Sequence, residues 1–266
     1  MLSRSEAVWA RLTELSFIGL FIVASILLLS IFIYIVDWIG IRALTDAVSS
    51  AEVLFAIRLS IATSSVSAAA ALLTSIPLAY VLSRTRFRGK TLIEAFLLLP
   101  FALPPIALGT ALLIFFSNSY LGRLVDQVIG IVFSVPGLIV AQYAVILPMV
   151  IRIIKTSFDS IDVRYEAVAR TLGYGTLGVI LRVMLPMSRR GLLTGFILGF
   201  TRAMGEFGAS IMLAGATRFK TETIPIAIYL AMSSGELHLA VAIVVISVIV
   251  SYVALVAMMK IGEDRW

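Results

Sequence analysis

The chain has no cysteine, and His238 is its single histidine. Without cysteine neither a disulfide nor a thiolate metal site can form, and one histidine leaves no convincing metal cluster. The sequence also lacks the G-x-x-x-x-G-K-[ST] pattern of a phosphate-binding loop, so we expect no nucleotide to bind to this chain. No nucleophile, base and orienting group stand together as a catalytic set. We therefore expect a protein that is not an enzyme and holds no cofactor or metal.

Charged residues are scarce and apolar residues abundant. Asp, Glu, Lys and Arg make up 14% of the 266 residues, hydrophobic residues make up 61%, and the mean hydropathy is +1.08. A soluble domain is only about 45–50% apolar. The apolar runs are long enough for helices to cross a membrane, and they do not alternate as barrel strands do. The sequence predicts an all-α integral membrane protein, one transmembrane domain over residues 1–266, with six spans near 16–36, 59–82, 95–121, 128–151, 191–217 and 239–259.

Lys and Arg are distributed unevenly between the predicted loops. If the N-terminus lies inside, fifteen of the 21 Lys and Arg residues fall on the inner side, five on the outer side, and Arg202 lies within a span. Cytoplasmic loops carry an excess of such residues, so the pattern predicts that both termini face the cytoplasm. The formal net charge of +6 therefore reports orientation in the bilayer, and we expect no nucleic-acid partner.

Prolines interrupt the third predicted span, which begins "LLLPFALPPIALG". Proline removes an amide donor and clashes with the preceding turn, so this span should be kinked or broken. The pair Pro104 and Pro105 is the best candidate for lining a passage across the membrane. The alternative is that these prolines only shape helix packing.

Two charges stand inside the fifth predicted span, "GFILGFTRAMGEFGASIMLAG". Arg202 and Glu206 are four residues apart, which places them on one helical face, and Gly205 lies between them. An ionisable residue in a span marks a functional site by default. A passage or gate role and a simple neutralising pair both remain open. Beyond this span, an apolar stretch of about ten residues from Ile224 is too short to cross and predicts a short surface or re-entrant helix.

The loop between the fourth and fifth spans, residues 156–190, is basic and punctuated by glycine. It contains "IDVRYEAVARTLGYGTLGVILRVMLP". This pattern predicts two short helices separated near Gly173 and Gly175, with Pro186 at the end, because glycine suits the C-terminal cap of a helix. Lipid surrounds the rest of the predicted chain, so this loop is the part most suited to binding a soluble partner.

The loop resembles the EAA motif of ABC-importer permeases, whose pattern is Glu-Ala-Ala, three residues, Gly, nine residues, Ile, one residue, Leu-Pro. Counted from Gly173, residues 167–169 take the first three positions, Val183 takes the isoleucine, and Leu185 and Pro186 close the motif. The glutamate, Glu166, stands one place early. The resemblance implies that the loop docks in a cleft of an ATPase subunit, with Leu172, Tyr174 and Leu177 as apolar anchors and with Arg170 and Glu166 as polar contacts at the rim. The implied coupling residues are Glu166, Ala167, Ala169, Arg170, Leu172, Gly173, Tyr174, Leu177, Leu185 and Pro186.

A wider resemblance covers most of the chain. The stretches "LPFALPPIALGTALL", "EAVARTLG", "TRAMGEFGASIMLAG" and "TETIPIAIYLAM" are similar to the molybdate, tungstate and sulfate permease group, and the last two look more like its molybdate and tungstate members. The resemblance implies a type I ABC-importer permease in a prokaryotic cytoplasmic membrane. It implies a second copy of this permease, a cytoplasmic ATPase homodimer that holds ATP and magnesium, and an external oxyanion-binding protein.

Three other functions stay open at this point. The first is import of sulfate or thiosulfate by the same kind of transporter. The second is ion-coupled secondary transport, which commonly uses paired halves and buried acids, although we find no internal repeat and Glu206 is the only acid well inside a span. The third is an intramembrane enzyme, which would need a catalytic set that the spans do not show.

Overall fold

The structure is a computed structural model that describes residues 4–263. Helices fill almost all of this range and no strand occurs within it, which confirms the all-α prediction. The elements in chain order are α1 (Arg4–Ile39), α2 (Ile41–Ser49), α3 (Ala51–Arg84), α4 (Lys90–Ala102), α5 (Pro105–Asn118), α6 (Tyr120–Ile129), α7 (Val135–Asp159), α8 (Val163–Thr171), α9 (Thr176–Val179), the π-helical turn η1 (Ile180–Met184), α10 (Leu185–Met187), α11 (Arg189–Met204), α12 (Gly208–Ala214), α13 (Ile224–Ser233) and α14 (Leu237–Glu263).

Four helices, α1, α3, α7 and α14, are long and apolar enough to cross a membrane. Two further segments qualify only as bent pairs: α4 and α5 meet at 108°, and α11 and α12 meet at 65°. The described part of the chain therefore holds four candidate spans, or six if each bent pair counts as one. The third predicted span is broken at its proline pair, and the fifth is broken after Gly205.

The boundary between the third and fourth spans differs from the prediction. Residues near 128 belong to the separate helix α6, and α7 begins only at Val135. The cause is local capping, which apolar content does not reveal. The Asp126 carboxylate accepts the amides of Ile131 at 2.7 Å and Val132 at 2.8 Å, which ends α6, and the Ser134 hydroxyl accepts the Gly137 amide at 3.3 Å, which starts α7.

Helices α3, α7 and α11 form the centre of the molecule and pack along much of their lengths. Small residues allow this close approach. A Cβ added to Gly199 of α11 would lie 3.1 Å from a methyl of Val150 on α7. Polar side chains bridge α3 and α7 in the same core: the Ser67 hydroxyl donates to Gln142 Oε1 at 3.1 Å, and Gln142 Nε2 donates to Thr63 at 3.2 Å.

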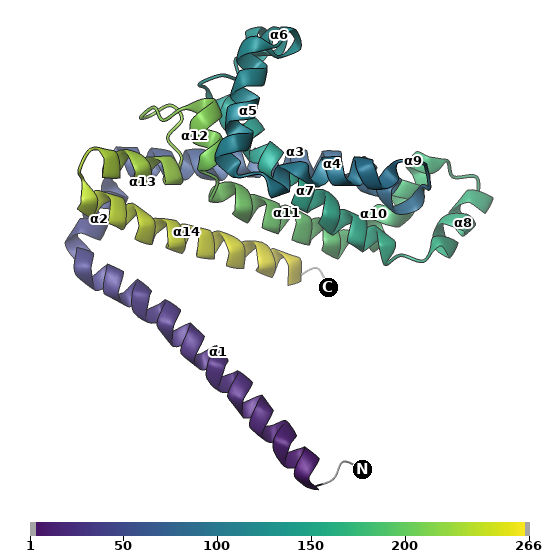
Figure 1. Cartoon of the computed structure of the whole chain (residues 1–266), viewed down its shortest axis with the longest axis horizontal. Helices are drawn as coiled ribbons and strands as arrows, with labels where there is room; N and C mark the ends of the chain where they lie inside the picture. Colours follow the sequence, from purple (N-terminus) through teal and green to yellow (C-terminus); the bar gives the residue numbers. More distant parts are fainter. Residues whose placement is uncertain (1–3, 264–266) are drawn as a thin grey trace.

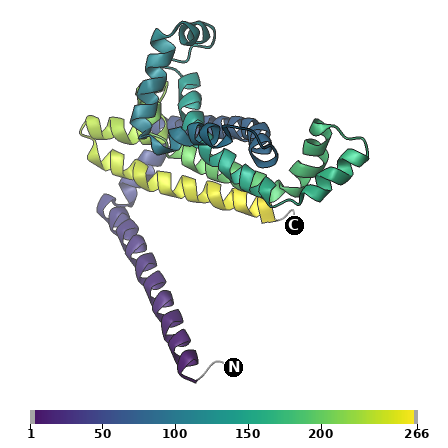
Figure 2. The same cartoon turned by 45° about the vertical axis from the view of Figure 1, so that its right-hand side comes forward.

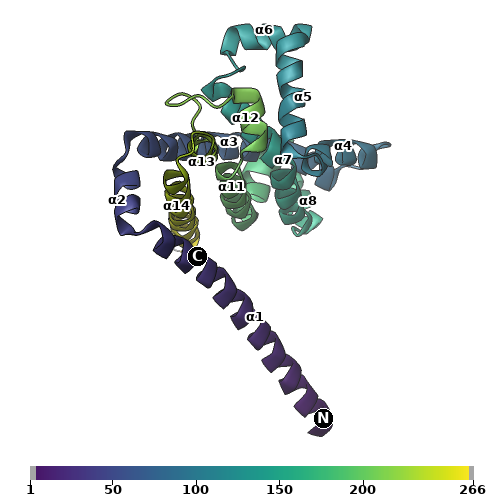
Figure 3. The same cartoon turned by 60° about the vertical axis from the view of Figure 1, so that its left-hand side comes forward.

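Two parts of the chain stand away from this centre. Helix α1 stands away from the bundle over most of its length (Figures 1 and 2), and only its C-terminal part contacts α14 and α2; nearly all its described side chains are exposed. Helices α5, α6 and α12 rise together on one side of the bundle (Figure 3). The predicted short helix after Ile224 exists as α13, which packs against α14 and α3: Ile224, Ile226 and Ala227 are buried, whereas Tyr229 and Met232 are exposed.

Candidate functional site

Two short helices, α8 and α9, lie in the segment between α7 and α11 that the sequence singles out, and we call this segment the inner loop after its predicted side of the membrane. The Asp162 carboxylate accepts the Arg164 amide at 2.9 Å and caps the start of α8. At the other end the Gly173 amide donates to the Arg170 carbonyl at 3.0 Å, and the Tyr174 amide donates to the Ala169 carbonyl at 3.1 Å. These two bonds define a Schellman cap, which requires a left-handed residue, and Gly173 has φ +87°. Gly173 therefore sets the turn between α8 and α9.

Glu166 lies inside this loop and not at its rim. Its side chain is buried, and it forms an ion pair with Arg84, the last residue of α3. The Tyr80 hydroxyl donates to Glu166 Oε2 at 3.2 Å and accepts a bond from Arg170 Nη2 at 3.2 Å. The expected rim contact of Glu166 is therefore corrected: the residue faces its own subunit, and only Arg170 stays exposed.

Arg84 also holds the end of α7. Its Nη2 atom donates to the Phe158 carbonyl at 2.9 Å and to the Ile161 carbonyl at 2.8 Å. Carbonyls at a helix C-terminus lack partners within the helix and carry partial negative charge, so a guanidinium is well suited to this place. One side chain thus joins α3, α7 and α8. Sequence reasoning counted Arg84 only as an inner-side cation, because nothing in the sequence relates it to a glutamate 82 positions away.

The remaining loop residues divide into an outward and an inward set. Leu172 and Leu177 are 72% and 69% exposed, and the side chains of Val163, Tyr165 and Val168 are exposed as well. Tyr174 is half-buried beneath Arg182, whose guanidinium lies 4.8 Å from the ring centroid and bonds to its hydroxyl at 2.8 Å. Among the others, Ala167 and Pro186 are exposed, Ala169 is buried, and Leu185 packs partly buried against the core.

The two bent spans meet at their breaks. Pro104 is the cap and Pro105 the first residue of α5. A Cβ added to Gly109 of α5 would lie 2.6 Å from the Cα of Ala209 on α12, and one added to Gly208 would lie 3.1 Å from Pro105. Such short distances leave no room for side chains, so the backbones of α5 and α12 touch just beyond the two breaks.

Glu206 occupies the break itself. Helix α11 ends at Met204 with Gly205 as its cap, so Arg202 and Glu206 do not share one helix as the sequence predicts. The ion pair nevertheless forms, at 2.7 Å. The other carboxylate oxygen of Glu206 accepts the Ala209 amide at 2.9 Å, which satisfies an amide at the start of α12. The five predicted passage residues thus lie at the two breaks, and Pro105 and Arg202 line the same hollow of about 140 Å³.

A cluster that the sequence does not reveal lies in the segment between α12 and α13. Glu222 is fully buried, and its carboxylate accepts the Phe219 amide at 2.9 Å. Arg218 lies 3.3 Å from Glu52 in the first turn of α3 and 3.9 Å from Glu236. Burial, and after it the Glu52 carboxylate, raises the pKa of Glu222 to about 7, against the lowering influence of the Phe219 amide and Arg218. We call Glu52, Arg218, Glu222 and Glu236 the carboxylate clasp.

Within residues 4–263 no group of three His, Cys, Asp or Glu side chains is arranged to hold a metal ion. His238 stacks on Trp38, with ring centroids 5.1 Å apart and planes 7° apart, which is a packing arrangement.

Comparison with known proteins assigns the family. Residues 71–266 match the family described as binding-protein-dependent transport system inner membrane component. The chain belongs to this family. It is therefore an integral membrane protein of the transport-permease kind, and the matched region contains the inner loop and both bent spans.

Among curated proteins, the chain is 35% identical to a probable molybdenum ABC transporter permease of Haloferax volcanii, over 84% of this chain and 81% of that protein. It is 33% identical to the molybdenum transport system permease ModB of Escherichia coli, over 79% of this chain and 95% of that one. A sulfate transport system permease, CysT of Salmonella typhimurium, is 36% identical over 62% of this chain and 61% of its own length.

A solved structure has the same fold. The bacterial alginate ABC transporter, in complex with a periplasmic protein carrying an alginate pentasaccharide, contains a chain that superposes with a TM-score of 0.72 at 16% identity. The match covers 98% of this chain and 95% of the other. At this identity the likeness concerns the fold alone, which is that of an ABC-importer permease.

Proposed function

We propose that this chain is the membrane permease subunit of an ATP-driven ABC importer for molybdate or tungstate. The family match and the two molybdenum-transport relatives support the importer class and the substrate. The chain crosses the membrane six times with both termini inside, so that each bent pair is one span. It forms a homodimer, takes its oxyanion from an external binding protein, and leaves ATP hydrolysis to two cytoplasmic ATPase subunits.

The single observation that carries the coupling mechanism is the Arg84 junction. Glu166 of α8, the end of α3 and the end of α7 all meet at one guanidinium. A displacement of α8 is therefore passed directly to two long helices. The exposed apolar face of α8 and α9, which includes Leu172 and Leu177, supplies the surface on which an ATPase subunit docks.

The gate lies where the two bent spans touch. When ATP closes the ATPase pair, α8 moves and carries α3 and α7 with it, which switches the spans between inward-open and outward-open arrangements. The breaks at Pro104 and Gly205 are the flexible points, and the contact of Gly109 with Ala209 makes α5 and α12 move together. Arg202 faces the hollow at these breaks and is positioned to contact an anion in passage.

The test is reconstitution of the whole transporter, with its ATPase and its binding protein, in liposomes. We expect molybdate- or tungstate-loaded binding protein to stimulate ATP hydrolysis and to drive uptake, and sulfate-loaded protein to do neither. Stimulation by sulfate alone would keep the importer and replace the substrate, an alternative that the sulfate relative supports. Failure of the ATPase to associate with the permease would overturn the coupling assignment.

A further inference from the structure

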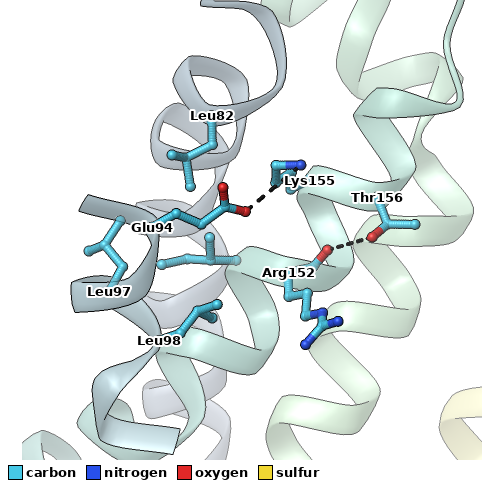
Figure 4. A pocket seen from close by; sticks show the side chains of 8 residues that line it. Leu82, Glu94, Leu97, Leu98, Arg152, Lys155 and Thr156 are labelled. Atoms are coloured by element: carbon cyan, nitrogen blue, oxygen red, sulfur yellow. Dashed lines mark hydrogen bonds and ion pairs between the residues drawn. The ribbon is translucent and has the colours of Figure 1, made fainter. Parts of the chain in front are cut away.

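Three hollows follow one another between α4 and α7. The first, of about 320 Å³, is shown in Figure 4 and lies at the inner end, between the ends of α3 and α7 and the start of α4. The second, of about 140 Å³, shares Leu98 and Arg152 with the first. The third, also of about 140 Å³, shares Phe101 and Met149 with the second and reaches Arg202 at the gate. Neighbouring hollows share wall residues, so the three lie in a row along α4 and α7, and we call this row the groove.

The sequence of α7 explains the groove. Val145, Met149, Arg152 and Thr156 recur three or four residues apart and therefore lie on one helical face. At 1.5 Å per residue this face extends for about 16 Å. It connects the gate with the inner end of α7, close to the Arg84 junction.

The charges along the groove are not equivalent. Lys155 is paired with Asp159 at 2.9 Å and lies 3.9 Å from Glu94, while Arg202 is paired with Glu206. The guanidinium of Arg152 has no hydrogen-bond or ion-pair partner among the residues described, and in Figure 4 it points away from Glu94 and Lys155. Arg152 is an exposed cation about two turns before the end of α7, where an anion that enters the first hollow can reach it.

We propose that the inner half of this groove is a transient subsite for a tetrahedral oxyanion, with Arg152 as its principal ligand. This proposal rests on the proposed function and adds that the anion reaches the subsite after it has passed the gate. The first hollow holds about ten water volumes, which is room for the anion together with part of its hydration shell. Lys155 adds positive charge at the inner end.

Glu94 makes the subsite weak. Its carboxylate lines the same hollow and opposes a second negative charge. Passage through a membrane requires binding that is favourable enough for entry and weak enough for release. The pairing of Lys155 with Glu94 and Asp159 limits the net positive charge of the hollow, so that Arg152 attracts the anion and Glu94 favours its departure towards the cytoplasm.

The first experiment compares Arg152→Gln with Arg152→Lys and with Lys260→Gln in the complete transporter. Lys260→Gln is the matched control, because Lys260 is an exposed cation near the end of α14 and lines none of the three hollows. We expect Arg152→Gln to lower tungstate uptake about tenfold, the loss of one charge-assisted contact, with the ATPase assembled and still stimulated by the loaded binding protein. Arg152→Lys should restore part of the uptake. Uptake by Arg152→Gln equal to that of Lys260→Gln would overturn the subsite.

A second variant removes a negative charge from the first hollow and should strengthen anion binding. Its result does not depend on whether Arg152→Gln folds. Removing the carboxylate in Glu94→Gln should raise the equilibrium binding of tungstate to the transporter without its binding protein, about three- to tenfold. Unchanged or weaker binding in Glu94→Gln would contradict the role of Glu94 and the subsite with it.

Lipid composition separates an oxyanion from a lipid phosphate, which shares its chemistry. The same uptake is measured in vesicles of phosphatidylcholine alone and in vesicles with added phosphatidylglycerol. A deficit of Arg152→Gln that is equal in both supports the oxyanion subsite, and a deficit present only with the anionic lipid overturns it in favour of a lipid headgroup. A wild-type transporter without uptake or ATPase stimulation would instead refute the proposed function.

Discussion

Arg84 and Glu166 form a buried ion pair between the last residue of α3 and the first turn of α8. Both side chains are almost inaccessible to solvent, and each has further partners, which satisfies the conditions under which a buried pair is stable. The pair therefore attaches the inner loop rigidly to the transmembrane bundle, and it is the first place at which the coupling mechanism can be tested.

Glu166→Gln should uncouple transport while the ATPase remains bound. Glutamine keeps the shape and a bond to Tyr80, but Arg84 becomes a buried charge without its counter-ion, which costs about 3–5 kcal/mol. We expect a lower melting temperature of the purified complex and a large loss of binding-protein-stimulated hydrolysis. Arg164→Gln is the control: Arg164 is 92% exposed and 3.9 Å from Asp162, and an exposed pair contributes about 0–1 kcal/mol. Equal effects of the two variants would contradict the junction.

Gly173→Ala should destabilise the turn of the inner loop without any steric clash. A Cβ at Gly173 meets no atom within 4 Å, but φ +87° costs a residue with a side chain about 1–2 kcal/mol. Gly175→Ala is the matched control, because Gly175 is equally open and has φ −70°. Coupled ATP hydrolysis should fall in Gly173→Ala and stay near wild type in Gly175→Ala. If both variants behave alike, the left-handed conformation is not what the turn requires.

Gly109→Ala should impair the gate. The new Cβ would lie 2.6 Å from the Ala209 backbone, so α5 and α12 must separate, at a cost of about 1–3 kcal/mol for overpacking. Uptake should decrease strongly and the melting temperature should fall. Gly19→Ala on the exposed helix α1 provides the comparison, since a Cβ there meets nothing within 4 Å. A harmless Gly109→Ala would show that the two bent spans are not in contact during transport.

The carboxylate clasp should weaken as the pH rises. The pKa of Glu222 is raised to about 7 in the folded protein, so between its ordinary value near 4.5 and 7 the folded state binds more protons than the open state. The contribution of Glu222 to the free energy of unfolding is therefore fully present below about pH 4.5 and is lost as the pH rises through about 7. We expect the melting temperature to fall across this window.

Glu222→Gln resembles the protonated form and should flatten this dependence. Glu236→Gln, at a half-exposed carboxylate, should leave it as in wild type. A pH profile identical in wild type and Glu222→Gln would show that Glu222 does not titrate in this range.

Much of the fold follows from apolar content, because a lipid-exposed helix must be apolar along its whole length. The apolar runs predicted as the first, second and sixth spans fall within α1, α3 and α14, whereas α7 begins seven residues after the predicted start of the fourth span. Pro104 and Pro105 also predict the break before α5. The break at Glu206 could not be foreseen, since a spacing of four residues fits a continuous helix equally well. The bond from the Ala209 amide to the Glu206 carboxylate, which caps the start of α12 at this break, has no counterpart in the spacing of the sequence.

In the candidate site, too, local features could be predicted from the sequence and long-range contacts could not. Glycine spacing predicts the two helices of the inner loop and the turn between them, because the cap is a local structure. The direction in which Glu166 points depends on Arg84, and the carboxylate clasp depends on Glu52 and Glu222 meeting across 170 residues. Such pairs arise from tertiary packing, which a single sequence does not encode in any local pattern.

The contact between Gly109 and Ala209 limits whether a second substitution can compensate for a side chain introduced at residue 109. The atom opposite Gly109 is a backbone Cα, which every amino acid possesses, so no replacement of residue 209 makes room for a side chain at residue 109. Gly199 is different, because its close neighbour is a methyl of Val150, and Val150→Ala would create space for it. In a library of paired variants, Gly199 should therefore have a compensating partner and Gly109 none.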